Sequence, residues 1–489
     1  MARLTRHFVY NLLGVTLPLA LAVVAVPLLA QSAGLARLGF LTIAWALIGY
    51  LGFLDLGLSR VMARRIAAAA DAAQLAEELR VMRRLVRLLA VGGAVIGAVL
   101  ALATPDKWLA SRYLPPDLAA EVRIAWVLIV ATLPMLLVSN IWRGAMEGRQ
   151  AFGEVNLYRL LFGAWMYGAP VVVAQWSPTL PALIGVIVVG RAVLTWLHWR
   201  WCARHLPHPP HDGTVTALPP VAAALKEGGW ITLSNAVGPL MVVSDRFILG
   251  VVLPLAAVAA YAVPQEVALR LLVLPAALAI TIFPAVASLA GAGAEASVLV
   301  RRAMRVAMAV TLPATFILAL LATPVLTFWM GADFAADSAS VLKILMIGIV
   351  VNAPAQIVFS SLQATGRART TAVLHVSELL PYVLVLWLAV SAFGPVGAAI
   401  AWSLRVVVDA FILMMIARSD DRAAVDARFL LAALTSMAAV GLAGAASLLA
   451  SPPLGAAGAT ALALLAVALM FNRDDRAVLF AALRRRALP

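Results

Sequence analysis

Residues 181–201 read PALIGVIVVGRAVLTWLHWRW, an apolar stretch with one arginine, Arg191, at its centre. A helix of about 20 apolar residues is long enough to cross the hydrocarbon core of a bilayer. Comparable stretches, about fourteen in all, fill the chain almost from end to end. Hydrophobic residues make up 64% of the 489 residues and charged residues only 12%. This composition excludes a water-soluble globular protein and predicts an all-α integral membrane protein.

The basic residues are unevenly divided between the two sets of loops that join the predicted spans. One set is rich in arginine, with Arg60, Arg64 and Arg65 after the second span and Arg484 to Arg486 in the tail, whereas the other set holds few. Loops rich in Arg and Lys lie in the cytoplasm by the positive-inside rule. The pattern predicts a multi-pass membrane protein with both termini cytoplasmic, which in a bacterial cell would place it in the inner (plasma) membrane. Anionic lipid headgroups then explain the net charge of +14, and we expect no nucleic acid partner.

Landmarks of the first six predicted spans return about 220 residues later in the chain. The pairs are Pro18 with Pro239, Trp108 with Trp329, Pro134 with Pro354, and Arg191 with Arg405. Six spans is an even number, so both halves keep one orientation, and parallel repeats of this kind are a transporter architecture. We predict two pseudo-symmetric six-helix lobes, an N-lobe over residues 1–210 and a C-lobe over residues 225–420. Helices 13 and 14 and a basic cytoplasmic tail follow over residues 425–489.

Short motifs near the ends of several spans resemble those of a known family. They are Asp245-Arg246 through Tyr261, the segment from Leu54 to Ser59, and Phe393-Gly394-Pro395-Val396-Gly397-Ala398 at the entry to the twelfth span. These resemble Wzx-type O-antigen and capsule flippases of the multidrug/oligosaccharidyl-lipid/polysaccharide exporter superfamily. The resemblance implies that the chain moves an undecaprenyl-diphosphate-linked oligosaccharide from the inner to the outer leaflet by alternating access, for O-antigen or exopolysaccharide synthesis. It also implies a polysaccharide polymerase and a chain-length regulator as partners.

Three arginines are predicted near the middle of the membrane: Arg191, Arg270 and Arg405. A charge at this depth is costly, so we expect each arginine to face a cavity or a partner. Guanidinium groups bind phosphate bidentately and keep their charge, which makes these residues candidate ligands for a diphosphate. Asn235 is a candidate hydrogen-bonding neighbour in the same cavity. Since Arg191 and Arg405 hold corresponding positions in the two lobes, we expect them to face each other across it.

Carboxylates accompany two of these arginines, and two interpretations of them stay open. Glu266 lies four residues before Arg270 and Asp409 four residues after Arg405, so each can form an ion pair along its helix. They are either local neutralising pairs or, together with Glu378 in the eleventh span, sites that couple transport to H+ or Na+.

Other polar residues have a simpler interpretation. Asp55 and Asp245 lie near helix ends and are expected to be solvated at the membrane interface. The loop around His205, His208 and His211 has no cysteine and no fixed scaffold, so we expect no metal there. We expect no cofactor either.

Three alternative functions compete with the polysaccharide flippase. A cation-coupled multidrug antiporter of the same superfamily and a lipid II flippase share the expected topology. The arginine-rich interior favours an anionic substrate over a cationic drug. A membrane polysaccharide polymerase or ligase needs catalytic groups on large extracytoplasmic loops, and the largest here, about 105–121, is short. No GxxxxGK[ST] nucleotide-binding motif is present, so we expect an ion or substrate gradient to drive transport and no enzymatic activity.

Overall fold

The computed structural model describes residues 20–50, 58–69, 71–102, 114, 116–207, 241, 244–289, 293–420, 425–446 and 452–470. Within these ranges every regular element is a helix, so the predicted all-α fold class is confirmed. The chain divides into two compact units, Met1–Ala259 and Ala260–Pro489. The limits of the two predicted lobes, and the duplication itself, stay predictions.

The described helices are apolar enough to belong to a membrane protein. Nine of them are long and apolar enough to cross a membrane in the described part of the chain, or ten when the bent pair α11 and α12 counts as one span. Their outer faces carry exposed apolar side chains such as Leu88 (65% exposed), Leu380 (80%) and Phe328 (95%). Lipid contact explains this exposure, which would be costly in water. The count of fourteen spans stays a prediction, because most of the first and seventh lie outside the described residues.

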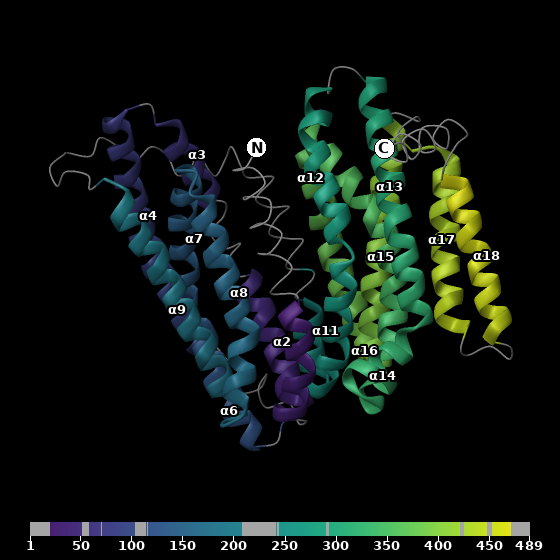
Figure 1. The fold of residues 1–489 in the computed structure, drawn as a ribbon, viewed down its shortest axis with the longest axis horizontal. Helices are drawn as coiled ribbons and strands as arrows, with labels where there is room; N and C mark the ends of the chain where they lie inside the picture. The colour runs from purple at the N-terminus through teal and green to yellow at the C-terminus, as the bar shows by residue number, and fades with distance from the viewer. Residues whose placement is uncertain are drawn as a thin grey trace, which may run out of the picture. The chain divides into compact units, whose positions relative to one another are not determined.

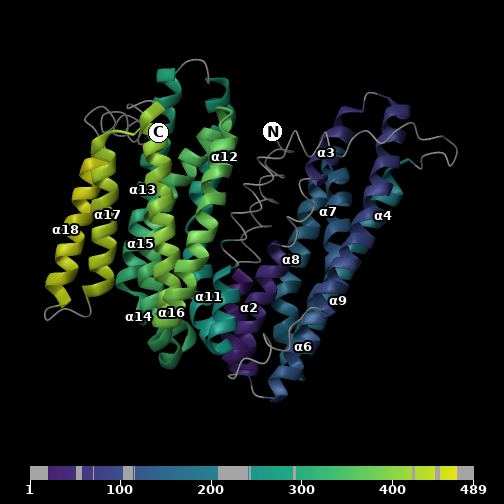
Figure 2. The same ribbon diagram turned by 180° about the vertical axis from the view of Figure 1, so that it is seen from behind.

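The first unit is built from helices that pack around α7 and α9. Its labelled helices are α2 (Leu35–Tyr50), α3 (Leu58–Ala68), α4 (Ala72–Leu102), α6 (Pro116–Val130), α7 (Leu133–Gly148), α8 (Phe152–Ala174) and α9 (Leu180–His205). α7 packs against α3, α4 and α9, and α8 runs along α9 (Figures 1 and 2). Both α7 and α9 have proline in their first turn, where the missing N–H costs nothing.

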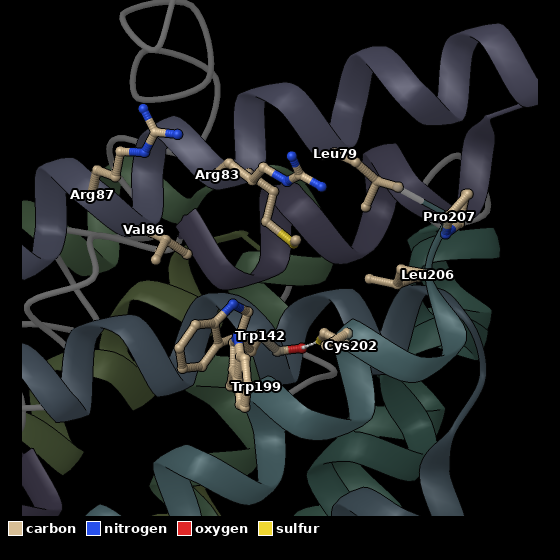
Figure 3. Close-up of a pocket in the computed structure, with 11 residues that line it drawn as sticks. Leu79, Arg83, Val86, Arg87, Trp142, Trp199, Cys202, Leu206 and Pro207 are labelled. Carbon is tan, nitrogen blue, oxygen red and sulfur yellow. Dashed lines mark hydrogen bonds between the residues drawn. The ribbon is translucent and has the colours of Figure 1, made fainter. Parts of the chain in front are cut away.

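The end of this unit that the arginine-rich loops join holds a compact apolar core. Met62, Ile66 and Ile141 are almost fully buried in it. Gly144 of α7 lets α3 come close, because a Cβ at this position would collide with the carbonyl oxygen of Ser59. A pocket opens beside this core between α4, α7 and α9 (Figure 3).

The second unit is built around α15, which is buried along most of its length. Its helices are α12 (Val273–Ser288), α13 (Gly293–Leu320), α14 (Ala322–Met330), α15 (Ala332–Ala364), α16 (Ala368–Asp420), α17 (Ala427–Ala445) and α18 (Pro452–Met470), and α11 (Leu255–Arg270) begins just before the unit boundary. α15 packs against α12, α13, α14, α16 and α17, and α17 pairs with α18 (Figures 1 and 2).

The helix α16 is interrupted where the sequence predicts the turn between spans eleven and twelve. Gly394 has φ 59° and ψ −137°, a conformation outside the helical region that glycine adopts at no steric cost. A Cβ at Gly397 would collide with the carbonyl oxygen of Ala389, so the turn also needs a second glycine. The break divides α16 into residues 368–393 and 395–420, which pack beside α15.

Candidate functional site

Arg191 lies in the interior of the first unit without an acidic partner. The side chain is on α9, is only 9% exposed, and has its guanidinium carbon 3.9 Å from the centroid of the Phe162 ring on α8. Within the described residues its guanidinium forms no hydrogen bond or ion pair, and its Nε is fully buried. The cation–π contact offsets roughly 1–2 kcal/mol of the cost of burying the charge. A bound anion could offset the remaining cost of burying this charge.

Two more arginines, on α7 and α8, extend the positive charge from Arg191. Arg143 on α7 is close enough to repel Arg191, and it also repels Arg159 on α8. Glu147 is the acidic neighbour that acts on Arg159. We call Arg143, Arg159 and Arg191 the arginine cluster.

His198 completes the surroundings of the arginine cluster. Its Nδ1 lies 2.7 Å from the Oγ of Ser139 on α7, and its ring meets the edge of Tyr158 on α8 with centroids 5.5 Å apart. Arg143 and Arg191 both lie near enough to act electrostatically on the imidazole. A neutral His198 that bonds to Ser139 is therefore the form that fits beside these two cations.

The second unit has a different arrangement at the corresponding helices. His375 and Glu378 lie on the first segment of α16, and Asp409 and Arg405 lie on its second segment. His375 Nε2 is 3.7 Å from Asp409 Oδ1, and these side chains are 12% and 9% exposed. Phe359 of α15 stacks on His375 with centroids 5.2 Å apart. We call His375, Glu378 and Asp409 the carboxylate cluster.

Glu378 is the member of this cluster whose charge is least compensated. Both of its carboxylate oxygens are buried and have no hydrogen-bond partner among the described residues. Asp409 is close enough for the two charges to act on each other, and Arg405 acts on both. Two carboxylates are both acceptors, so a hydrogen bond between them requires one to carry a proton. The cluster can thus hold a proton or a cation.

The arginines of the predicted spans six and twelve are held in similar ways. Arg405 lies over the ring of Tyr382 at 5.8 Å, as Arg191 lies over Phe162. In each case the ring belongs to the preceding predicted span. Phe162 and Tyr382 are about 220 residues apart, which is the predicted repeat period. Whether Arg191 and Arg405 face each other stays a prediction, since each is described within its own unit.

Arg270 and Glu266 form the ion pair along α11 that their spacing allows. Arg270 Nη2 lies 3.1 Å from Glu266 Oε2, and the side chains are 37% and 43% exposed. The substrate role of Arg270 and the coupling role of Glu266 stay predictions. Asn235 and Asp55 lie outside the described residues.

The expectation that Asp245 is solvated was wrong. Asp245 is 0% exposed and Arg246 is 2% exposed. Nη1 of Arg246 donates to the carbonyl oxygen of Thr42 on α2, 3.0 Å away. Residues 244–252 therefore pack against α2, and this tertiary contact buries a position near a helix end.

Sequence reasoning missed three members of these clusters, Arg143, Arg159 and His375, and also His198 beside them. His375 lies three residues before Glu378 on the same helix face, which is a usable signal. His198 lies seven residues after Arg191 and was equally visible in the apolar stretch. Arg143 and Arg159 were not selected, because both lie nearer the arginine-rich end of their helices than the middle of the membrane.

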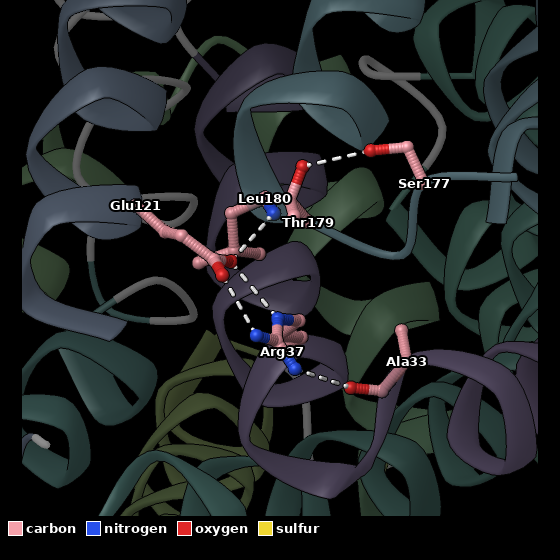
Figure 4. A network of polar contacts seen from close by, with 6 residues as sticks. All are labelled: Ala33, Arg37, Glu121, Ser177, Thr179 and Leu180. Carbon is pink, nitrogen blue, oxygen red and sulfur yellow. Dashed lines mark hydrogen bonds and ion pairs between the residues drawn. The ribbon is translucent and has the colours of Figure 1, made fainter. Parts of the chain in front are cut away.

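A further polar network ties three helices together at the opposite end of the first unit (Figure 4). Arg37 of α2 donates to both oxygens of Glu121 on α6, at 2.7 and 2.9 Å. The backbone N–H of Leu180, the first residue of α9, donates to Glu121 Oε2 at 2.8 Å. Glu121 thus pairs with an arginine and also satisfies a free N–H at a helix start.

Comparison with known proteins identifies the family to which the chain belongs. Residues 4–290 match the sequence profile of the family described as "Polysaccharide biosynthesis protein". A protein of Shigella flexneri named "Putative O-antigen transporter" is 31% identical over 412 residues, which cover 83% of this chain and 96% of that protein. The chain belongs to the polysaccharide biosynthesis protein family.

Solved structures of low sequence identity share the fold of this family member. The lipid II flippase MurJ, in an inward closed conformation, matches with a TM-score of 0.68 at 12% identity and covers 98% of this chain and 99% of its own. An inward-facing multidrug resistance MATE family transporter of the MOP superfamily matches with a TM-score of 0.67 at 14% identity, over 83% and 97% of the two chains. The family resemblance stated from short motifs is confirmed by the sequence profile and the Shigella flexneri relative, and these structures show that the fold is the expected one.

Proposed function

We propose that this protein is a flippase that moves an undecaprenyl-diphosphate-linked oligosaccharide from the cytoplasmic to the outer leaflet of the bacterial inner membrane. The observation that carries the proposal is the 31% identity to the Shigella flexneri O-antigen transporter over 96% of its length. The arginine-rich loops orient the chain with both termini in the cytoplasm. Transport proceeds by alternating access and supplies cell-surface polysaccharide synthesis.

The arginine cluster is the proposed site for the diphosphate. Arg143 and Arg159 lie roughly 8–10 Å along their helices from the arginine-rich end, and Arg191 lies roughly 20 Å from it, at 1.5 Å per residue. This forms a line of positive charge that leads inward from the proposed cytoplasmic side. Arg159 is exposed and meets the diphosphate first, while the buried Arg191 adds to the field behind it. Arg270, Arg405 and Asn235 are the further proposed ligands.

The sign of this cluster supports an anionic substrate over a cationic drug. Three guanidinium groups with one carboxylate in reach repel a cation and attract phosphate, which they can bind bidentately. A multidrug antiporter for cations needs the reverse, uncompensated carboxylates in the substrate path. The MATE transporters share the fold at 14–18% identity, and this supports only the architecture.

The carboxylate cluster is the proposed coupling site, and H+ is its proposed ion. Glu378 and Asp409 are close together and His375 lies beside Asp409, so the arrangement is stable when one proton offsets one of the two carboxylate charges. Binding and release of that proton changes the net charge around Arg405, which can bias the second unit between two packings. Glu266 is a weaker candidate, because Arg270 already neutralises it.

The named relatives are transporters and flippases, and we propose that this chain likewise carries out no catalysis itself. A polysaccharide polymerase and a chain-length regulator are the proposed partners that act after translocation.

Deletion of the gene followed by complementation tests the function. The deletion strain should lose the surface polysaccharide and accumulate the lipid-linked oligosaccharide on the cytoplasmic side, and the intact gene should reverse both effects. Gel analysis of surface polysaccharide and extraction of lipid-linked intermediates measure these outcomes. Unchanged polysaccharide with altered sensitivity to cationic drugs would instead support the multidrug antiporter.

A further inference from the structure

The pocket at the arginine-rich end of the first unit is separate from the arginine cluster. It has a volume of about 340 Å³ and is lined by residues of α4, α7 and α9, none of which belongs to the arginine cluster. In Figure 3, Arg83 and Arg87 project from α4 on one side, and Trp142, Trp199 and Cys202 lie on the other. Two cationic side chains therefore line one side of the pocket, and an aromatic and apolar wall lines the other.

The charges of Arg83 and Arg87 are uncompensated in the described part of the chain. Nearby arginines have partners, since Arg65 Nε lies 2.7 Å from Glu78 and Arg80 Nη2 lies 2.8 Å from Glu77. Arg83 and Arg87 form no hydrogen bond or ion pair with any described residue. They are four residues apart and so lie on one face of α4, one turn from each other. An anion bound at this pair of cations would neutralise their charge.

The side chains next to the pocket are apolar and exposed, which suits a ligand with an apolar tail. Trp199 is 48% exposed, and tryptophans are favoured at the headgroup level of a bilayer. Further along α4, Leu88, Val91 and Val95 are 65%, 64% and 56% exposed. These side chains continue from the pocket along the outer face of the helix, where an acyl chain can lie. A cationic mouth followed by an apolar track fits a lipid that carries a phosphate.

We propose that this pocket binds the phosphate headgroup of an anionic phospholipid from the membrane leaflet at this end of the unit. A volume of about 340 Å³ suits a glycerophosphate headgroup and lies at the low end of ligand pockets. An oligosaccharide is larger than this pocket, so we assign the pocket to the smaller phospholipid headgroup, and competition with undecaprenyl diphosphate tests that assignment. The bound lipid joins α4 to α7 and α9 at the side that we propose faces the cytoplasm.

The test measures phospholipid binding by the purified, delipidated full-length protein. Phosphatidylglycerol is titrated in detergent and bound lipid is counted by native mass spectrometry, with phosphatidylcholine as the zwitterionic reference of zero net charge. The Arg83→Gln, Arg87→Gln double variant should weaken phosphatidylglycerol binding roughly thirtyfold. Each arginine near an anionic headgroup strengthens binding by about five- to sixfold, and two such factors multiply. Arg84→Gln is the matched control, because Arg84 is exposed on the same helix and does not line the pocket.

The controls decide between this site and its alternatives. An equal loss in the Arg84→Gln control would overturn the proposal and reduce the effect to surface charge. Displacement of phosphatidylglycerol by undecaprenyl diphosphate at equal or lower concentration would also overturn it, because the pocket would then belong to the substrate. Should the double glutamine variant fail to fold, the Arg83→Lys, Arg87→Lys variant retains the charge and should retain most of the binding. Loss of binding in that folded lysine variant would contradict the electrostatic argument.

Discussion

The two units place similar arginines in opposite electrostatic surroundings. Arg191 lies over Phe162 and Arg405 lies over Tyr382, each ring coming from the preceding predicted span. The charge that acts on Arg191 is positive, from Arg143, which also repels Arg159. Around Arg405 the charges are negative, from Glu378 and Asp409, with His375 beside them. The two helix pairs thus hold an arginine in the same way in opposite surroundings, which agrees with the two different ligands that we propose for them.

Each cluster carries uncompensated charge of the sign that its proposed ligand would neutralise. An excess of buried positive charge is stabilised by an anion, and a pair of adjacent carboxylates is stabilised by a proton or a cation. The first unit is therefore suited to the diphosphate and the second to the coupling ion. The alternative is that the first unit binds the coupling ion and the second binds the diphosphate. The following experiments distinguish these two assignments.

Removal of the arginine cluster should have the largest effect on transport. We expect the Arg159→Ala, Arg191→Ala double variant to reduce transport by about 100-fold, because losing the proposed contact of Arg159 and the field of the buried Arg191 should together cost about 3 kcal/mol. Surface polysaccharide in a complemented deletion strain measures the loss, at matched protein levels. Phe162→Leu is the control, since it removes only the ring beneath Arg191 and should cost less than tenfold. If the double variant transports as well as the wild type, the assignment of the substrate site to Arg159 and Arg191 is contradicted.

Loss of the carboxylate cluster should affect coupling more than substrate binding. In proteoliposomes, Glu378→Gln should abolish the acceleration of transport by a pH gradient while exchange of substrate down its own gradient continues. Net transport should fall roughly tenfold, less than for the arginine variant, since a substrate gradient still drives it. Asp409→Asn should behave similarly, and Glu266→Gln is the exposed control that should keep its response to pH. A pH response that survives in Glu378→Gln, together with a sodium dependence, would move the coupling to Na+ or to another site.

The pair Arg270 and Glu266 distinguishes a substrate ligand from a local ion pair. Arg270→Ala should reduce transport about fivefold if the guanidinium contacts the diphosphate, because at 37% exposure it is screened by water. Arg270→Lys should be less affected, since it keeps the charge but loses the bidentate geometry. The Glu266→Gln, Arg270→Ala double variant distinguishes the two interpretations of this ion pair. It stays impaired if Arg270 binds substrate, and it recovers full complementation if the two charges only neutralise each other.

The sequence was sufficient for the fold class and for part of the sites. Apolar stretches of span length require helices in a bilayer, and the glycines of the Phe393–Ala398 motif are required by the turn that Gly394 makes. Glu378 could be selected because a carboxylate in an apolar helix is costly. Its neighbours could not be selected in the same way, since they depend on how spans eleven and twelve pack. Asp409 was expected beside Arg405, which does act on its charge, but the sequence did not show that His375 on the other segment of α16 lies 3.7 Å from it as well.

The smallest expected effects concern stability, where the two units use the same device. Glu121 pairs with Arg37 and accepts from the N–H of Leu180 at the start of α9, and Asp426 pairs with Arg305 at 2.8 Å and accepts from the N–H of Phe429 in α17. Removing a carboxylate leaves its arginine with one fewer partner, and the cost rises as the arginine is more deeply buried.

Arg305 is 2% exposed and Arg37 28%, so Asp426→Asn should lower stability by about 3 kcal/mol and Glu121→Gln by about 1–2 kcal/mol. Thermal unfolding of both variants in the same detergent measures the order, with Glu77→Gln as the control for an exposed pair that should change little. Transport at permissive temperature should stay near wild type in all three. A larger loss for Glu121→Gln than for Asp426→Asn would mean that the network of Figure 4 stabilises the fold through more than its ion pair.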